Sequence, residues 1–225
     1  MFIRRLIEFL EEPVQESDKY KLFVGDCFHL EVYYSRDTRV LRICPNGFYL
    51  RCSLGEFEGD FTLDDVLYFL GVLSAIFAGY DVEEESERKL FFWKHKDNLY
   101  LGIKRSAGCS FVVYEDTFVY HVFFVLYVYL FNLLPHEVVY KDFLFTYEGF
   151  FFRDYFVSWS RVYLDEVLSF FSPFGFVDRL QYGSFVMERY DDGLFVRFED
   201  EVKGLSWFDY FVLGNLFIHF LGGLR

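Results

Sequence analysis

The sequence predicts an α+β protein made of four β-hairpin–helix (ββα) units. Four turn signals recur between apolar strands, and the second residues of the pairs are spaced by 51, 51 and 44 positions: Asn46-Gly47, Asp97-Asn98, Glu148-Gly149 and Asp192-Gly193. Such pairs accept the backbone angles of tight hairpin turns. A long apolar segment follows each hairpin, and the regular spacing indicates an internal repeat. We therefore expect antiparallel sheets packed against apolar helices.

The repeat also predicts a tandem duplication. Leu63–Leu70 matches Leu164–Phe171 at an offset of 101 residues, and the turns that precede them lie 102 apart. Units one and three resemble each other most, which predicts an A–B–A′–B′ order. The first half, 1–112, is expected to hold an N-terminal helix, a three-stranded unit, a helix and the second hairpin. The second half, 113–225, would hold a helix, a hairpin, a helix, a hairpin and a helix. We expect the halves to pack as one compact body.

The predicted helices carry start signals and few polar positions. Thr62-x-x-Asp65 and Ser206-x-x-Asp209 have the form of capping boxes, in which a hydroxyl and a carboxylate satisfy amide groups of the first turn. Beyond that turn the helices are apolar nearly all round, so each must contact more than one layer. The segment 117–134 has no formal charge. We interpret it as a buried helix because no basic cluster flanks it.

The first hairpin predicts two different sheet faces. A two-residue turn at Asn46-Gly47 puts apolar side chains on one face: Leu41, Ile43, Leu50 and Cys52. The other face is mixed: Arg42, Cys44, Tyr49 and Arg51. The same register places Arg42 opposite Arg51, a like-charge pair that needs a partner, and Cys44 opposite Tyr49.

The cysteines are predicted to be free thiols. The chain has four, without CxxC spacing: Cys27, Cys44, Cys52 and Cys109. The predicted register points Cys44 and Cys52 to opposite faces, which excludes a direct bridge between them. Buried free thiols in a reducing compartment are therefore expected, and we predict a cytoplasmic protein.

Composition limits the classes of partner. The chain has 22 Lys and Arg against 35 Asp and Glu, a formal net charge of −13, and 24 % of its residues are aromatic. Affinity for nucleic acid depends on Lys and Arg near phosphates, so the charge disfavours a nucleic-acid partner. It also disfavours anionic lipid surfaces, and no membrane partner is expected.

No pattern predicts catalysis or metal binding. The five histidines are scattered and form no HxH, HxxxH or HExxH pair, and the fingerprints GxGxxG, GxxxxGK[ST] and GxSxG are missing. Glu56, Glu58 and Asp60 alternate and would share one face if extended. Gly55 and Gly59 favour a solvated acidic connection instead. We expect no catalytic residues, no cofactor and no metal, and hence not an enzyme.

Basic and aromatic residues of the first two hairpins form the best candidate for an interaction patch. Its members are Arg36, Arg39, Arg42, Tyr49, Arg51, Trp93, Lys94, Lys96, Tyr100 and Lys104. The leading hypothesis is a non-enzymatic protein-interaction module, an adaptor, inhibitor or chaperone-like binder, whose partner is another protein or a second copy. One alternative is a single-stranded nucleic-acid binder that uses hairpins 36–51 and 93–105. The other is a viral or homo-oligomeric assembly component.

The predicted order of elements in the first half resembles a known group of proteins. The predicted order is helix, three strands, helix, two strands and helix. This order is similar to the fold of the small acidic chaperones of type III secretion. The resemblance concerns element order and rests on no shared motif. It implies a chaperone-like binding role as one option.

Overall fold

The computed structural model describes residues 15–16, 20–34, 37–53, 55–82, 88–95, 98–105, 108–114, 117–172, 175–190 and 193–222. Within them the chain is α+β, with antiparallel sheets, four α-helices and more strand than helix. This confirms the predicted class. The predicted N-terminal helix lies outside the described residues. The chain divides into two compact units, 1–69 with 80–133 and 70–79 with 134–225.

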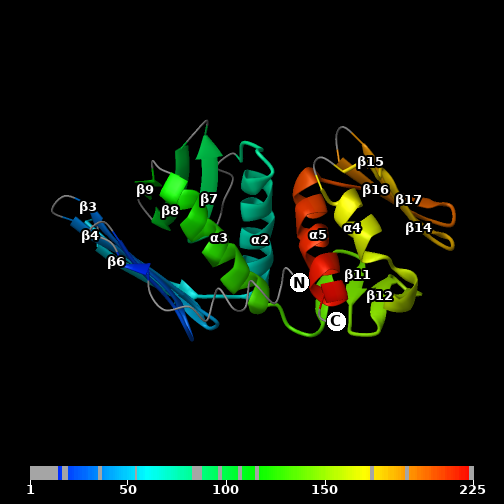
Figure 1. Ribbon diagram of the computed structural model, residues 1–225, viewed down its shortest axis with the longest axis horizontal. Coiled ribbons are helices and arrows are strands. Elements are labelled where there is room, and N and C mark those ends of the chain that lie inside the picture. Colours follow the sequence, from blue (N-terminus) through cyan, green and yellow to red (C-terminus); the bar gives the residue numbers. More distant parts are fainter. Residues whose placement is uncertain are drawn as a thin grey trace. The chain divides into compact units, whose positions relative to one another are not determined.

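The first unit contains two sheets whose strands follow one another in sequence order (Figure 1). The larger has six strands: β1 (Gln15–Glu16), β2 (Tyr20–Val24), β3 (Phe28–Tyr34), β4 (Asp37–Cys44), β5 (Gly47–Cys52) and β6 (Gly55–Asp60). Helix α2 (Leu63–Phe77) follows, and its residues from 70 onward group with the second unit. Next come β7 (Leu90–His95), β8 (Asn98–Arg105), β9 (Gly108–Tyr114) and helix α3 (Thr117–Asn132). The predicted boundary at 112/113 falls inside β9.

The second unit contains two four-stranded sheets. The first is β10 (Val138–Tyr140), β11 (Phe143–Phe145), β12 (Gly149–Phe152) and β13 (Tyr155–Ser158), followed by a 3-10 turn (Trp159–Arg161) and helix α4 (Leu164–Phe170). The second is β14 (Arg179–Tyr182), β15 (Phe185–Tyr190), β16 (Gly193–Phe198) and β17 (Glu201–Leu205), followed by helix α5 (Trp207–Gly222). Helix α4 has seven residues and is shorter than predicted.

Each sheet is therefore a meander that leads into a helix, with more strands than the predicted hairpin. The strands β6, β9, β13 and β17 complete these meanders. The described elements of the first half are six strands, a helix, three strands and a helix. This order differs from the one on which the likeness to type III secretion chaperones rested, so the structure gives that likeness no support. The tandem duplication remains a prediction.

All four predicted hairpins are present, and each closes one residue earlier than expected. Gly47, for example, pairs with Cys44 as the first residue of β5. Glycine is required there by a neighbouring strand, because a Cβ on Gly47 would lie 2.5 Å from the carbonyl oxygen of Gly59. Gly149 and Gly193, at the equivalent places in two other sheets, also face a carbonyl oxygen of the adjacent strand. The glycines serve close backbone approach, as well as marking the turn.

The earlier turn changes the pairs and keeps the faces. Leu41 lies opposite Leu50, and Arg42 lies opposite Tyr49 rather than Arg51. Both strands shift by one residue relative to the turn, so the parity of the pairing is unchanged and each side chain stays on its predicted face. The predicted like-charge Arg42–Arg51 pair is wrong.

A disulfide joins Cys27 to Cys44, with their Cα atoms 4.3 Å apart. Phe28 lies opposite Ile43, so the β3–β4 ladder brings the two cysteines face to face just beyond its end. The prediction of free thiols is therefore wrong for this pair. Cys52 is a free thiol, and the side chain of the fourth cysteine lies outside the described residues.

Both predicted capping boxes are present. The backbone N–H and Oγ1 of Thr62 donate to Oδ2 of Asp65 at 2.8 and 2.7 Å, and the N–H of Asp65 donates back to Oγ1 at 3.2 Å. Ser206 and Asp209 repeat this arrangement at 3.0, 2.8 and 3.2 Å. The local sequence alone therefore predicts both helix starts.

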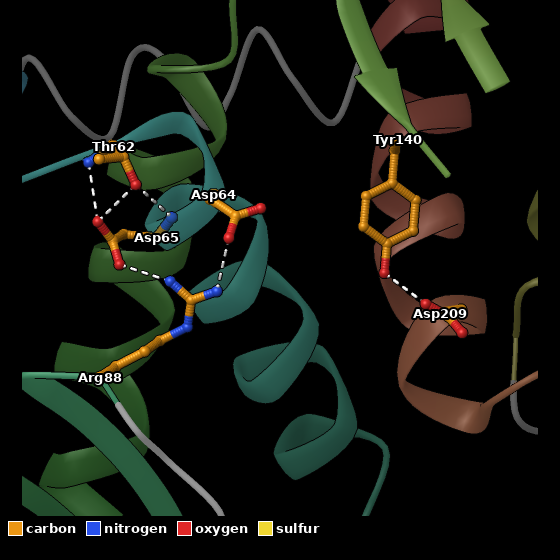
Figure 2. Close-up of polar contacts among 6 residues, drawn as sticks. All are labelled: Thr62, Asp64, Asp65, Arg88, Tyr140 and Asp209. Carbon is orange, nitrogen blue, oxygen red and sulfur yellow. Dashed lines mark hydrogen bonds and ion pairs between the residues drawn. The ribbon is translucent and has the colours of Figure 1, made fainter. Parts of the chain in front are cut away.

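The two carboxylates differ in their further partners, as Figure 2 shows. Arg88 donates through Nη1 to Asp65 at 2.6 Å and through Nη2 to Asp64 at 2.9 Å. The hydroxyl of Tyr140 donates to Oδ1 of Asp209 at 2.6 Å. Asp65 is thus held by an arginine, and Asp209 by a phenol with the ammonium of Lys141 3.4 Å away.

Aromatic side chains fill the core of the second unit. Phe217 of α5 meets Phe145 and Phe150 at centroid distances of 5.2 and 5.0 Å, in edge-to-face geometry. Asn215, also buried in α5, donates its amide to the carbonyl of Phe211 and to Oγ of Ser74. The apolar helix predicted from the sequence is therefore enclosed by its own unit.

Helix α3 belongs to the first unit. Tyr129 donates its hydroxyl to the carbonyl of Asp26 at 2.9 Å, and its ring lies 6.3 Å from that of Phe28. The helix thus packs on the inner side of the six-stranded sheet. Within the described residues, no helix combines the length and the apolar character that crossing a membrane requires.

Candidate interaction surface

The six-stranded sheet has a buried inner face and a partly exposed outer face. Leu41, Ile43 and Leu50 are at most 2 % exposed and mark the inner face. Alternation along the paired strands assigns fourteen side chains to the outer face, of which Val40 is buried: Lys21, Phe23, His29, Glu31, Tyr33, Thr38, Val40, Arg42, Cys44, Tyr49, Arg51, Glu56, Glu58 and Asp60. We call this set the outer face.

Arg42 lies at the middle of the outer face. Its Nε donates to Nδ1 of His29 at 3.4 Å, and its guanidinium carbon lies 5.9 Å from the ring centroid of Tyr49. Burial and the charge of Arg42 lower the pKa of His29, against the opposing effect of Glu31. A neutral imidazole is the form that can accept the hydrogen bond from Arg42.

Carboxylates alternate with these cations. Arg51 lies opposite Glu56, and Tyr49 lies opposite Glu58. Desolvation and a hydrogen bond to Glu56 raise the pKa of Tyr49. Phosphate recognition needs an unbroken cluster of cations. The outer face instead interleaves carboxylates with arginines and aromatic rings, and only the arginines and rings are residue types that are enriched in protein interfaces.

The structure brings together three members of the predicted patch. Arg42, Tyr49 and Arg51 share the outer face, whereas Arg39 pairs with Val32 and lies on the opposite, inner face. Arg39 therefore does not share a sheet face with Arg42 and Arg51, because residues 39 and 42 differ by an odd number. Arg36 and Lys96 are outside the described residues, and only the backbone of Lys104 is described.

The remaining members belong to the three-stranded sheet. Trp93 and Tyr100 are directly opposed and stack with centroids 4.7 Å apart and an interplanar angle of 9°. The ring of Trp93 also covers Gly102, where a Cβ would come within 2.8 Å of it. Lys94 lies on the other face of β7. These rings stack on one another and do not form a joint basic and aromatic platform with Lys94.

Two exposed rings of the outer face were missed by sequence reasoning. Phe23 is 48 % exposed and Tyr33 is 40 % exposed. The signal for both rings is the alternation of side chains between the two sheet faces. Phe23 is next to the buried Leu22, and Tyr33 is two residues from Glu31 and so lies on the same face. Extending the face assignment beyond the first hairpin would have found both.

The stretch predicted to be an acidic connection is also part of the outer face. Residues 55–60 form β6 and pair with β5 along their whole length. Glu56, Glu58 and Asp60 are all exposed. The two glycines suggested a loop, but Gly59 serves packing, because a Cβ there would lie 2.7 Å from the ring of Phe48.

A pocket of about 200 Å³ opens at the end of β6. It is lined by Phe48, Asp60, Phe61, Asp65, Phe69, Lys89 and Leu90. Its phenyl walls are buried, Asp65 is half-buried, and Asp60 and Lys89 are exposed. A cavity of about 150 Å³ with apolar walls is large enough for a benzene ring. The pocket has room for one side chain, and its phenyl groups can contact the apolar part of that side chain.

Other perturbed groups have structural explanations. Burial alone would raise the pKa of Asp209, but hydrogen bonds from Tyr140 and Ser206 outweigh it and lower the pKa. Burial raises the pKa of Tyr129 to about 12 and lowers that of His219 to about 4. In the part of the chain that the structure describes, no three His, Cys, Asp or Glu residues are grouped as metal ligands.

Comparisons with known proteins assign no relatives to this arrangement. The sequence matches no protein-family model. No curated protein and no solved structure matches the chain significantly.

Proposed function

We propose that the chain is a non-enzymatic protein-interaction module, an adaptor, inhibitor or chaperone-like binder, and that the outer face is its contact surface. The observation that carries the proposal is the exposure of Phe23 and Tyr33 beside Arg42 and Arg51 on one sheet face. Aromatic residues and arginine are enriched in protein interfaces and supply most of the binding energy at hot spots.

The surface is also preorganised. Hydrogen-bonded ladders connect β2 to β6, and the disulfide between Cys27 and Cys44 ties β3 to β4 at the end next to Arg42. A rigid surface loses little conformational entropy when a partner binds. The outer face therefore has both the chemistry and the fixed geometry that a contact surface needs.

Selection from a displayed library of random peptides tests the proposal. The wild-type chain should enrich ligands whose binding falls at least tenfold in the double variant Phe23→Ser and Tyr33→Ser. The control is Phe156→Ser with Tyr147→Ser, which removes one Phe and one Tyr of similar exposure, 41 % and 49 %, from the second unit. Ligands that bind both double variants equally would refute the outer face as the contact surface.

Two further measurements separate the alternatives. A gel shift with single-stranded oligonucleotides, weakened by salt and abolished by Arg42→Glu with Arg51→Glu, would favour the nucleic-acid binder over our proposal. Light scattering that gives a stable multiple of the chain mass would favour the homo-oligomeric assembly component. We expect no salt-sensitive shift and the mass of a single chain.

We also propose the A–B–A′–B′ duplication and a cytoplasmic location. The A–B–A′–B′ duplication draws support from the glycines Gly47, Gly149 and Gly193, which meet a neighbouring carbonyl oxygen in equivalent places. The cytoplasmic location also remains a proposal. The disulfide of Cys27 and Cys44 counts against it, because disulfides persist mainly in oxidising compartments.

A further inference from the structure

Strand β6 forms one edge of the six-stranded sheet. Among the described strands it pairs with β5 and with no other. Phe61 donates its N–H to the carbonyl of Asn46, which fixes the phase of the ladder. Because hydrogen-bonded pairs alternate along an antiparallel ladder, the backbone groups of Phe57 and Gly59 point toward β5. Those of the intervening residues point away from the sheet.

The outward-pointing backbone positions carry the three carboxylates. Glu56, Glu58 and Asp60 direct their N–H and C=O groups to the open edge and their side chains to the outer face. Within the described part of the chain, the side chains of Glu58 and Asp60 form neither a hydrogen bond nor an ion pair, whereas Glu56 is hydrogen-bonded to Tyr49. Residues two apart on a strand are about 7 Å apart. An added strand with a basic residue at every second position would match this spacing.

The other face of the same edge presents a place for apolar residues. Gly59 has no side chain, and the ring of Phe48 lies over it. The pocket lined by Phe48, Phe61 and Phe69 is next to the end of β6. In an added strand, side chains that alternate with the basic ones would point to this face. One of them can enter the pocket.

We infer that β6 binds an extended basic segment of a partner protein by strand addition, with lysine or arginine alternating with apolar residues. The inference rests on the proposed function and names its partner class. Backbone hydrogen bonds to an edge strand supply affinity, and alternate side chains supply specificity. The occupant is chosen by charge, because the edge carries Glu56, Glu58 and Asp60 and the whole chain has a net charge of −13.

Edge carboxylates have a second known use, which the test must separate from binding. Charged residues on an edge strand discourage pairing between copies of the same chain. If protection from self-association is their whole role, a basic extended peptide will not bind at β6, and neutral variants will aggregate. If β6 is a docking edge, the peptide will bind and the added strand will protect the edge amides.

The test uses fluorescence anisotropy with a labelled synthetic peptide in which lysine alternates with leucine. A peptide of the same composition with its lysines and leucines in separate blocks is the first control. We expect the alternating peptide to bind at least tenfold more tightly than the block peptide, and less tightly as salt rises. Equal binding of the two peptides would show simple charge attraction and would overturn the inference.

Variants locate the site. Glu56→Lys with Glu58→Lys should weaken the alternating peptide at least tenfold, and Glu56→Gln with Glu58→Gln should weaken it less. The matched control is Glu137→Lys with Asp154→Lys, the same charge change on exposed residues of the second unit. Circular dichroism confirms that each variant is folded. Equal losses in both Lys variants would refute a site at β6.

Amide hydrogen exchange gives a readout that charge alone does not move. On binding the alternating peptide, the amides of Glu56 and Glu58 should exchange at least tenfold more slowly, because they gain partners. Unchanged exchange there would overturn strand addition. If the exchange experiment contradicts strand addition while the binding of library ligands still depends on Phe23 and Tyr33, the proposed function stands and this inference alone is wrong.

Discussion

The two capping boxes have the same local hydrogen bonds and different surroundings. The Asp65 side chain is 21 % exposed and is held by Arg88, which is itself 28 % exposed. The Asp209 side chain is 8 % exposed and meets Tyr140, with the ammonium of Lys141 3.4 Å away. Local sequence therefore decides that a box forms, and tertiary packing decides how much of the unit's stability depends on it.

The largest predicted difference concerns the carboxylate of Asp209. Replacement by alanine removes the helix cap and leaves the half-buried hydroxyl of Tyr140 and the hydroxyl of Ser206 without their acceptor. We expect Asp209→Ala to lower the free energy of unfolding by about 3 kcal/mol. Urea denaturation followed by circular dichroism measures this. A loss under about 1 kcal/mol would show that burial adds nothing to the box.

The boxes illustrate what the sequence predicts well. A capping box needs two residues three apart, so its signal is local and survives any tertiary arrangement. The apolar helices and the four hairpins are local patterns of the same kind. The two faces of β4 and β5 were also predicted correctly, because alternation depends on parity alone.

Long-range contacts explain what the sequence did not show. Gly47 was assigned to the turn, whereas the carbonyl of Gly59 on the next strand decides its position. Strand β6 resembles a loop in composition, and only its pairing with β5 shows otherwise. The disulfide of Cys27 needed the β3–β4 register. The part of the candidate surface formed by Arg42, Tyr49 and Arg51 was therefore predictable, and the open edge was not.

Acid should weaken the helix of the buried box. Burial lowers the pKa of His219 on α5 to about 4, below its ordinary 6.5. The unfolded state then binds the proton more readily, so stability is complete above about pH 6.5 and declines as the pH falls toward 4. Because His219 is partly exposed and solvent screens its charge, we expect the free energy of unfolding to fall by about 2 kcal/mol over this pH range. His219→Leu should flatten this decline, and an unchanged pH slope would contradict the assignment.

The exposed box should be less costly to remove. Asp65→Ala loses the cap of Thr62 and the ion pair with Arg88, both partly in water, so we expect a loss of about 1.5 kcal/mol. Arg88→Gln separates the two contributions and should cost about 0.5 kcal/mol, and less in high salt. The contrast between the boxes would be broken if Asp65→Ala cost as much as Asp209→Ala.

Removal of the Tyr140 phenol, which donates to Asp209, should cost less than removal of either carboxylate. In Tyr140→Phe the carboxylate keeps its bonds with Ser206 and the nearby Lys141, so the expected loss is about 1 kcal/mol. The variant also raises the lowered pKa of Asp209. A carboxylate with a lowered folded pKa stabilises above its unfolded pKa and loses this as the pH falls through the folded pKa. Acid unfolding should therefore begin at a higher pH in Tyr140→Phe, whereas the control Tyr147→Phe, at an exposed position, should leave the acid limb unchanged.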